Sequence, residues 1–183
     1  RSLVLLTTDE DDLVRHATPA PAVEGPDTAT PSRHLAGDWE VRTVDGVDID
    51  DPQAVGPPRL DVWTRFRDAP TDPLLAQALL AFASDGFLIA TAMRPHPGVG
   101  QALAHVTLAT GVVSDTCPFH EPFAIDEWLL LRHESPYAGR GRSFGRADVF
   151  TAEGALVASF NQDAMLRAMP DADRARDSGP RNL

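Results

Sequence analysis

The sequence contains no lysine, so its 16 basic residues are all arginine, and they are outnumbered by 27 aspartate and glutamate residues. The formal net charge of −11 argues against non-specific binding to nucleic acids or anionic membranes, because such binding needs clustered cations. A small polyanionic ligand held by a few local arginines is compatible with this charge. The composition therefore predicts no nucleic-acid partner and no membrane partner.

The chain has a single cysteine, Cys117, which excludes an intramolecular disulfide. No charged segment followed by an apolar stretch marks a secretory signal, and no apolar run approaches the ~20 residues needed to span a bilayer. Histidine or carboxylate pairs with the spacing of a zinc site are absent from the sequence, as are the GxSxG and P-loop motifs. These absences favour a cytoplasmic protein with no metal and no cofactor.

The length of 183 residues suits one domain with a sizeable core plus extra material at the N-terminus. Residues 2–8, SLVLLTT, are aliphatic and β-branched and predict a short strand. Residues 17–32 are mainly Pro, Ala, Thr and acidic residues, which bury too little apolar surface to fold alone, so we predict a linker. Beyond Ala168 the chain is polar, and we predict a disordered tail.

The central part of the chain predicts an α+β fold with one long helix and an antiparallel sheet. Residues 71–84 have an N-cap candidate at Thr71 or Asp72, Pro73 in the first turn, and apolar residues on nearly every face. A helix that is apolar all round is expected to be buried. Alternating or β-rich segments predict strands at residues 39–44, 60–67, 105–117, 126–135, 142–150 and 155–167.

Three segments resemble, in order and spacing, the second half of a type II acyl-CoA thioesterase. They are FASDGFLIATAMRPH (residues 82–96), FHEPFAIDEWLLL (residues 119–131) and GALVASFNQDAMLR (residues 154–167). The resemblance implies a hotdog fold, in which the sheet wraps the long helix, over residues 34–167. It also implies that residues 1–33 are the last strand of a preceding hotdog plus a linker, and that residues 168–183 are a disordered tail.

The resemblance to a double-hotdog enzyme has consequences for assembly. The resemblance implies that most of the first hotdog is missing from the sequence given, and Arg1 is not an initiator methionine. We therefore expect a segment to precede the sequence given. We also expect the domain to pair with a second hotdog domain or with another copy of itself.

Two polar residues stand where the local pattern favours apolar ones. Asp85 lies at the end of the apolar helix, where the helix dipole disfavours a carboxylate, and a surface aspartate at a helix exit is the alternative interpretation. Gln162 lies in register with the apolar side of the last strand, where an unpaired amide costs about 1–3 kcal/mol. The resemblance implies that Asp85 deprotonates the attacking water and that Gln162 positions it.

The third catalytic group of the family is a Ser or Thr on the strand before Phe119. Counting back without gaps places it at Val112, which has no hydroxyl. Thr110, Ser114 and Thr116 share the side of Val112 if side chains alternate regularly. We therefore take Ser114 or Thr110 as the substitute; without one, the site is slow, altered or inactive.

The remaining polar candidates are arginines and histidines. Arg132, Arg140 and Arg142, with Arg146, fall on two adjacent predicted strands and their turn. They are either a solvated strand face or a phosphate clamp for coenzyme A. His120 and His96 are interpreted as structural residues.

The leading hypothesis is a thioesterase-like enzyme that hydrolyses acyl-CoA to the free acid and coenzyme A by direct attack of water. A non-catalytic domain that binds acyl thioesters, or serves as a scaffold, is an alternative favoured by Val112. A hotdog dehydratase or cyclase of secondary metabolism is a third, and it needs a histidine beside the acyl chain.

Overall fold

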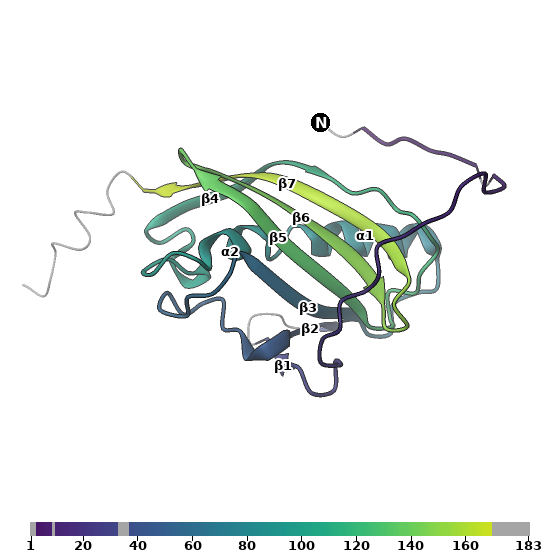
Figure 1. Cartoon of the computed structure of the whole chain (residues 1–183), viewed down its shortest axis with the longest axis horizontal. Helices are drawn as coiled ribbons and strands as arrows, with labels where there is room; N and C mark the ends of the chain where they lie inside the picture. The colour runs from purple at the N-terminus through teal and green to yellow at the C-terminus, as the bar shows by residue number, and fades with distance from the viewer. Residues whose placement is uncertain (1–2, 9, 33–36, 170–183) are drawn as a thin grey trace, which may run out of the picture.

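A computed structural model describes residues 3–8, 10–32 and 37–169 of the chain. The described residues form one seven-stranded antiparallel sheet in the order β1-β2-β3-β5-β6-β7-β4. The sheet curves around the helix α1, which lies behind it in Figure 1. The strands are β1 (Thr30–Pro31), β2 (Trp39–Thr43), β3 (Arg59–Phe66), β4 (Leu108–Thr116), β5 (Leu129–Gly139), β6 (Arg142–Thr151) and β7 (Leu156–Ala168). The helices are α1 (Pro73–Ser84) and α2 (Leu88–Met93), with short 3-10 turns at Val44–Gly46 and Gln101–Leu103.

This architecture confirms the α+β prediction and most of the predicted elements. β2, β3 and the three C-terminal strands lie where apolar and polar residues alternate in the sequence. The main core lies between α1 and the inner face of the sheet. It includes Ala76, Leu80, Ala83, Leu129, Leu131, Val149, Ala158 and Phe160.

The start of α1 is set by local chemistry. The Asp72 side chain accepts hydrogen bonds from the backbone N–H groups of Leu74 (2.8 Å) and Leu75 (3.1 Å). Pro73 follows in the first turn, where its missing N–H costs nothing. Asp72 is therefore the N-cap, one of the two residues predicted for that role.

The prediction that α1 is buried on every face is wrong. Ala76, Leu80 and Ala83 face the sheet and are buried, whereas Leu74 and Phe82 are 73% and 61% exposed. The reason is geometrical, since one sheet covers only one side of a helix. The described residues leave the opposite, equally apolar side of α1 uncovered.

The two helices correct the prediction that no apolar run approaches the length of a membrane span. Pro73–Met93 is long and apolar enough to cross a membrane by length and composition, with a hydropathy of 1.6. This is weak evidence for a membrane span, because the core helix of a soluble protein passes the same test. Here the stretch is broken at Phe87, whose backbone is left-handed, and α2 packs against β5 and β6.

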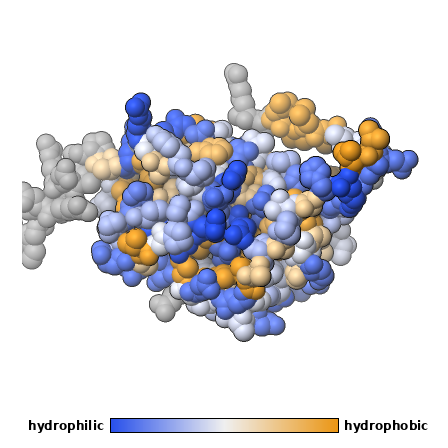
Figure 2. Space-filling view, viewed as in Figure 1, coloured by the Kyte–Doolittle hydropathy of each residue, from blue (hydrophilic) through white to orange (hydrophobic). Residues whose placement is uncertain are grey.

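The N-terminal segment differs from its prediction. Leu3–Thr8 form no strand, and the side chains of Leu3, Val4, Leu5 and Leu6 are exposed. Figure 2 shows this apolar segment standing away from the rest of the molecule. A strand requires a neighbour for its backbone groups, and no described strand lies beside these residues. Their assignment to a preceding hotdog stays a prediction.

The predicted linker is partly ordered on the domain. β1 pairs with β2, Ala29 is buried, and the Trp63 indole N–H donates to the Glu24 carbonyl at 2.8 Å. This segment covers Trp63, Leu130 and Phe150 on the outer face of the sheet. The predicted disordered tail falls on residues 168–183, of which residues 170–183 lie outside the described part of the chain.

His133 is a fully buried histidine on the inner face of β5. Its ring packs between Phe87 and Phe160, with centroid distances of 5.7 Å to each. The Nδ1 atom lies 3.1 Å from the Leu60 carbonyl and donates to it, while Nε2 has no partner among the described residues. Burial lowers the pKa of His133 to about 4, so the ring is neutral at pH 7.

We expect His133 to make the fold acid-sensitive. Because its folded pKa of about 4 lies below the unfolded value, the unfolded chain binds the extra proton first as the pH falls. The free energy of unfolding should therefore drop by about 3 kcal/mol between pH 7 and pH 4 through this residue. Denaturant unfolding at several pH values tests this. His133→Leu should flatten the slope, whereas His96→Leu, at an exposed position, should leave it unchanged; equal slopes in all three proteins would contradict the assignment.

Candidate active site

A β-bulge in β4 determines which of its side chains face α1. The pairing with β7 runs Val112 to Ala164, then shifts, so that Ser114 pairs with Asp163 and Asp115 pairs with Gln162. Paired residues in a sheet point to the same face. Gln162 is on the inner face and only 1% exposed. Asp115 therefore faces inward beside Gln162, while Ser114 faces outward beside Asp163.

This bulge corrects the prediction for the third site residue. Ser114 and Thr116 do not share the side of Val112, because the extra residue Val113 inverts the alternation between them. Thr110 does face inward, but it pairs with Leu166, four residues along β7 from Gln162. That separation is about 13 Å at the rise of a strand. Neither Ser114 nor Thr110 is brought to Gln162.

Gln162, one of the predicted site residues, contacts Ser84, the residue before the other, Asp85. The Gln162 side-chain N–H₂ approaches the Ser84 carbonyl oxygen at 3.5 Å, and Ser84 directly precedes Asp85. The Oε1 atom of Gln162 is buried and has no hydrogen-bond partner among the described residues. Asp85 itself is the C-cap of α1 and is exposed. The end of α1 and the middle of β7 thus meet at one place.

Asp115 is a candidate site residue that sequence reasoning missed. Its Oδ2 atom lies 2.9 Å from the Ser84 hydroxyl oxygen, which joins β4 to the end of α1. Burial raises the pKa of Asp115, hydrogen bonds from Ser84 and the Thr116 backbone oppose that shift, and the negative charge of Asp85 adds to it. The two carboxyl groups are therefore electrostatically coupled. The bulge cannot be read from the sequence, because regular alternation places Asp115 on the outer face.

The group at the end of α1 comprises Ser84, Asp85, Asp115 and Gln162, and we call it the helix-end site. It offers two carboxyl groups and an amide at one location. Such a set can accept a proton from water, orient that water and donate a proton elsewhere. Groups of three or more metal-ligating residues are absent from the described residues.

The predicted arginine clamp lies on the other face of the sheet. Arg142 pairs with Asp163 at 3.0 Å and Arg146 with Glu134 at 2.9 Å, both on the outer face. Arg132 is on the same face opposite Asp61, and Arg140 occupies the β5–β6 turn with a φ of 54°. Figure 2 shows hydrophilic residues gathered over this side of the molecule. Binding of coenzyme A by these arginines stays a prediction, and its geometry does not involve the helix-end site.

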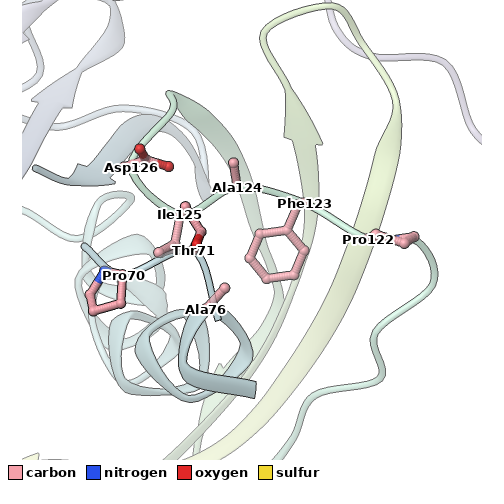
Figure 3. A pocket seen from close by; sticks show the side chains of 8 residues that line it. All are labelled: Pro70, Thr71, Ala76, Pro122, Phe123, Ala124, Ile125 and Asp126. Carbon is pink, nitrogen blue, oxygen red and sulfur yellow. The ribbon is translucent and has the colours of Figure 1, made fainter. Parts of the chain in front are cut away.

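The two hollows described next in the surface do not coincide with the helix-end site. One, of about 280 Å³, is formed by the start of α1 and residues 122–126, with Ala76, Phe123 and Ile125 among its walls (Figure 3). A second, of about 410 Å³, lies between residues 15–17 and residues 120–121 and 154–156. Neither is lined by Asp85, Asp115 or Gln162.

His120 lies beside the second hollow in a hydrogen-bonded position. Its backbone N–H donates to the Val157 carbonyl at 2.8 Å, and its Nε2 lies 3.0 Å from the Ser159 hydroxyl. Ser159 in turn donates to Asp148 at 2.9 Å. These bonds tie the loop that contains His120 to β6 and β7, which agrees with the structural role predicted for it.

The family of the acyl-CoA thioesterase C-terminal domain matches residues 11–166. The chain belongs to this family. Among curated proteins, it is 30% identical over 100 residues to acyl-CoA thioesterase 2 of Haemophilus influenzae, a match covering 55% of this chain and 34% of that protein. It is 26% identical over 139 residues to acyl-coenzyme A thioesterase 8 of Mus musculus, covering 75% of this chain and 42% of that protein. The chain thus spans less than half the length of these relatives.

Solved structures confirm the hotdog fold. Acyl-CoA thioesterase II TesB2 from Mycobacterium marinum matches with a TM-score of 0.72 at 31% identity, covering 88% of this chain and 60% of that one. A hot dog fold protein from Alicyclobacillus acidocaldarius matches with a TM-score of 0.64 at 20% identity, covering 88% and 59%. The second similarity shows the fold alone.

We expect Ser84→Ala to loosen the junction between α1 and β4. The change removes the hydroxyl of the buried Ser84, which donates to Asp115, and should lower the free energy of unfolding by about 0.5–1.5 kcal/mol. Urea unfolding measures the difference. Ser114→Ala is the matched control, because the exposed Ser114 faces outward, and it should change stability by less than about 0.5 kcal/mol. Equal effects of the two substitutions would contradict the geometry of the bulge.

Proposed function

We propose that this domain hydrolyses acyl-CoA to the free acid and coenzyme A by direct attack of water at the helix-end site. The observation that carries the proposal is the contact of buried Gln162 with Ser84, beside Asp85, in a chain of the acyl-CoA thioesterase family. The family relatives named above are called acyl-CoA thioesterases, which supports the substrate class. The cytoplasm stays the predicted compartment.

The roles follow from the position of each side chain. Asp85 is exposed at the end of α1 and acts as the general base that takes a proton from the attacking water. The Gln162 Oε1 atom, which is buried and unpartnered among the described residues, accepts a hydrogen bond from that water and aims it. Thioesters are reactive enough that no covalent acyl-enzyme is needed. The products are a carboxylic acid and a thiol.

One observation favours a second function, a non-catalytic domain that binds acyl thioesters or acts as a scaffold. Val112 supplies no hydroxyl at the position implied by the family resemblance, and the bulge directs Ser114 away from the site. A dehydratase or cyclase has no such support, because His133 is sealed in the core and His120 is bonded to Ser159.

We expect Asp85→Asn to lower kcat for acyl-CoA hydrolysis by about 100- to 10,000-fold, because the amide keeps the shape of the carboxylate but cannot take the proton. Gln162→Ala should also impair hydrolysis through lost positioning of the water. The measurement is coenzyme A release across a series of acyl chain lengths. Asp126→Asn, a carboxyl group beside the first hollow, is the matched control and should retain activity. If the unmutated protein binds acyl-CoA but does not hydrolyse it, the proposal of a non-catalytic binding domain replaces that of an enzyme.

We infer that the uncovered side of α1 is where a second hotdog domain or a second copy of this chain packs. Leu74, Leu75 and Phe82 form an exposed apolar strip on the helix, opposite the buried strip that faces the sheet. Contiguous apolar surface of this kind marks an interface. The relatives named above are more than twice as long as the regions they share with this chain, which is consistent with a second domain.

We expect the chain to self-associate through this strip in the absence of a second domain. Leu74→Gln should shift the protein toward the monomer, because it places an amide in the interface at a highly exposed position where the fold loses little. Light scattering coupled to gel filtration measures the mass. Phe144→Gln, on the outer face of the sheet, should leave the mass unchanged. A monodisperse monomer of the unmutated chain would contradict self-association.

A further inference from the structure

Gln162 makes few polar contacts that fix the direction of its side-chain amide. Its N–H₂ group reaches the Ser84 carbonyl oxygen at 3.5 Å, the long limit of a hydrogen bond, and its Oε1 atom has no partner among the described residues. The side chain is nevertheless only 1% exposed. Packing around the amide, more than hydrogen bonding, therefore decides its direction.

A glycine lies beside Gln162 on the neighbouring strand. Gly145 of β6 pairs with Gln162 of β7, so both positions face the inner side of the sheet. Side chains that lie opposite each other in this way have Cβ atoms about 4.5–5.5 Å apart, and a glycine has no Cβ atom. β6 therefore leaves a space next to the amide, into which the Gln162 side chain can swing unless another element fills it.

Leu88, the first residue of α2, fills this space. A Cβ atom built on Gly145 would lie 2.7 Å from Cδ2 of Leu88 and 3.3 Å from its Cβ and Cγ atoms. Carbon atoms in contact are normally about 3.5–4.0 Å apart. Leu88 is 3% exposed, so neighbouring atoms restrict its movement. Its side chain thus lies where a β6 side chain would otherwise pack against Gln162.

One short turn carries both Leu88 and Asp85. α1 ends at Asp85, and the backbone turns at Phe87, which is left-handed with a φ of 71°. Such a backbone is unfavourable for a bulky residue and persists only where the surrounding packing holds it. The Phe87 ring packs against the buried His133, with 5.7 Å between the ring centroids. This anchored turn therefore sets the position of Leu88 on β6 and of Asp85 at the end of α1 together.

We propose that Leu88 is a positioning residue for Gln162: it fills the space above Gly145 and keeps the amide directed toward the end of α1. This inference rests on the proposed function, in which the amide aims the attacking water beside Asp85. Leu88 touches neither the water nor the thioester in this role and acts only through Gln162. Removing the Leu88 side chain should let the amide turn over β6.

The first test measures the contact between Leu88 and Gly145 and does not depend on activity. Gly145→Ala should lower the melting temperature by about 5 °C, because the added methyl group overlaps Leu88. In the Leu88→Ala background the same substitution should cost little or raise the melting temperature, because the methyl group enters vacated space. Gly111→Ala in β4 is the matched control, since a Cβ atom there meets only Met165 at 4.0 Å. Its effect should be equal in both backgrounds.

The second test follows the Gln162 amide directly. Its side-chain N–H₂ signals in a ¹H–¹⁵N spectrum are identified by their loss in Gln162→Ala. Leu88→Ala should shift these signals, because it opens the space beside the amide. Leu130→Ala is the matched control: it truncates a leucine that is 2% exposed in the cluster with Trp63 and Phe150, and it should leave the Gln162 signals in place.

The third test is kinetic. Leu88→Ala should lower kcat for acyl-CoA hydrolysis by about 10- to 100-fold with little change in KM, because the amide no longer aims the water. In the Gln162→Ala background, Leu88→Ala should cause no further fall in kcat, since no amide is left to position. Leu130→Ala should keep the kcat of the unmutated protein. If Leu88→Ala does not fold, Leu88→Val gives a milder form of each comparison.

Three results would overturn the positioning role. They are additive effects of Gly145→Ala and Leu88→Ala on the melting temperature, unmoved Gln162 signals in Leu88→Ala, and an equal fall in kcat with and without the Gln162 amide. If the unmutated protein hydrolyses no thioester, the proposed function fails, and the melting temperatures and amide signals still decide whether Leu88 holds Gln162.

Discussion

The packing of α1 against the sheet through one strip of small and aliphatic residues is the constraint on which the rest of the structure depends. Ala76, Leu80 and Ala83 contact the inner face of the strands, and complete burial of a leucine such as Leu80 stabilises a fold by about 1.5–3 kcal/mol. The small side chains at the other two positions let the helix approach closely. This packing fixes the distance between the last turn of α1 and the sheet, and so brings Ser84 into contact with Gln162 and Asp115.

The chemistry of the helix-end site depends on how few cations it contains. The described ion pairs among Arg59, Arg65, Arg142 and Arg146 and their acidic partners lie away from the inner face of β7. Asp115 therefore gains little from neighbouring positive charge, and burial raises its pKa.

The outer face of the sheet and the free side of α1 differ in polarity. The outer face of the sheet carries charged residues and the N-terminal segment that packs on Trp63 and Phe150. The free side of α1 is apolar and, within the described residues, uncovered. The chain spans less than half the length of its curated relatives.

The sequence by itself determined the α+β class and most strands, narrowed the N-cap of α1 to Thr71 or Asp72, and predicted Asp85 and Gln162 as site residues, because these depend on short-range periodicity, capping and a resemblance carried by contiguous motifs. Only the tertiary structure decided three further features. The burial of α1 on one side depends on which elements pack against it. The polarity of its residues does not reveal that one side is left uncovered. The path of residues 17–32 over Trp63 depends on long-range contacts. The inward position of Asp115 depends on the bulge at Val113, because one extra residue in a strand reverses the face of each later side chain while leaving the pattern of residue types unchanged.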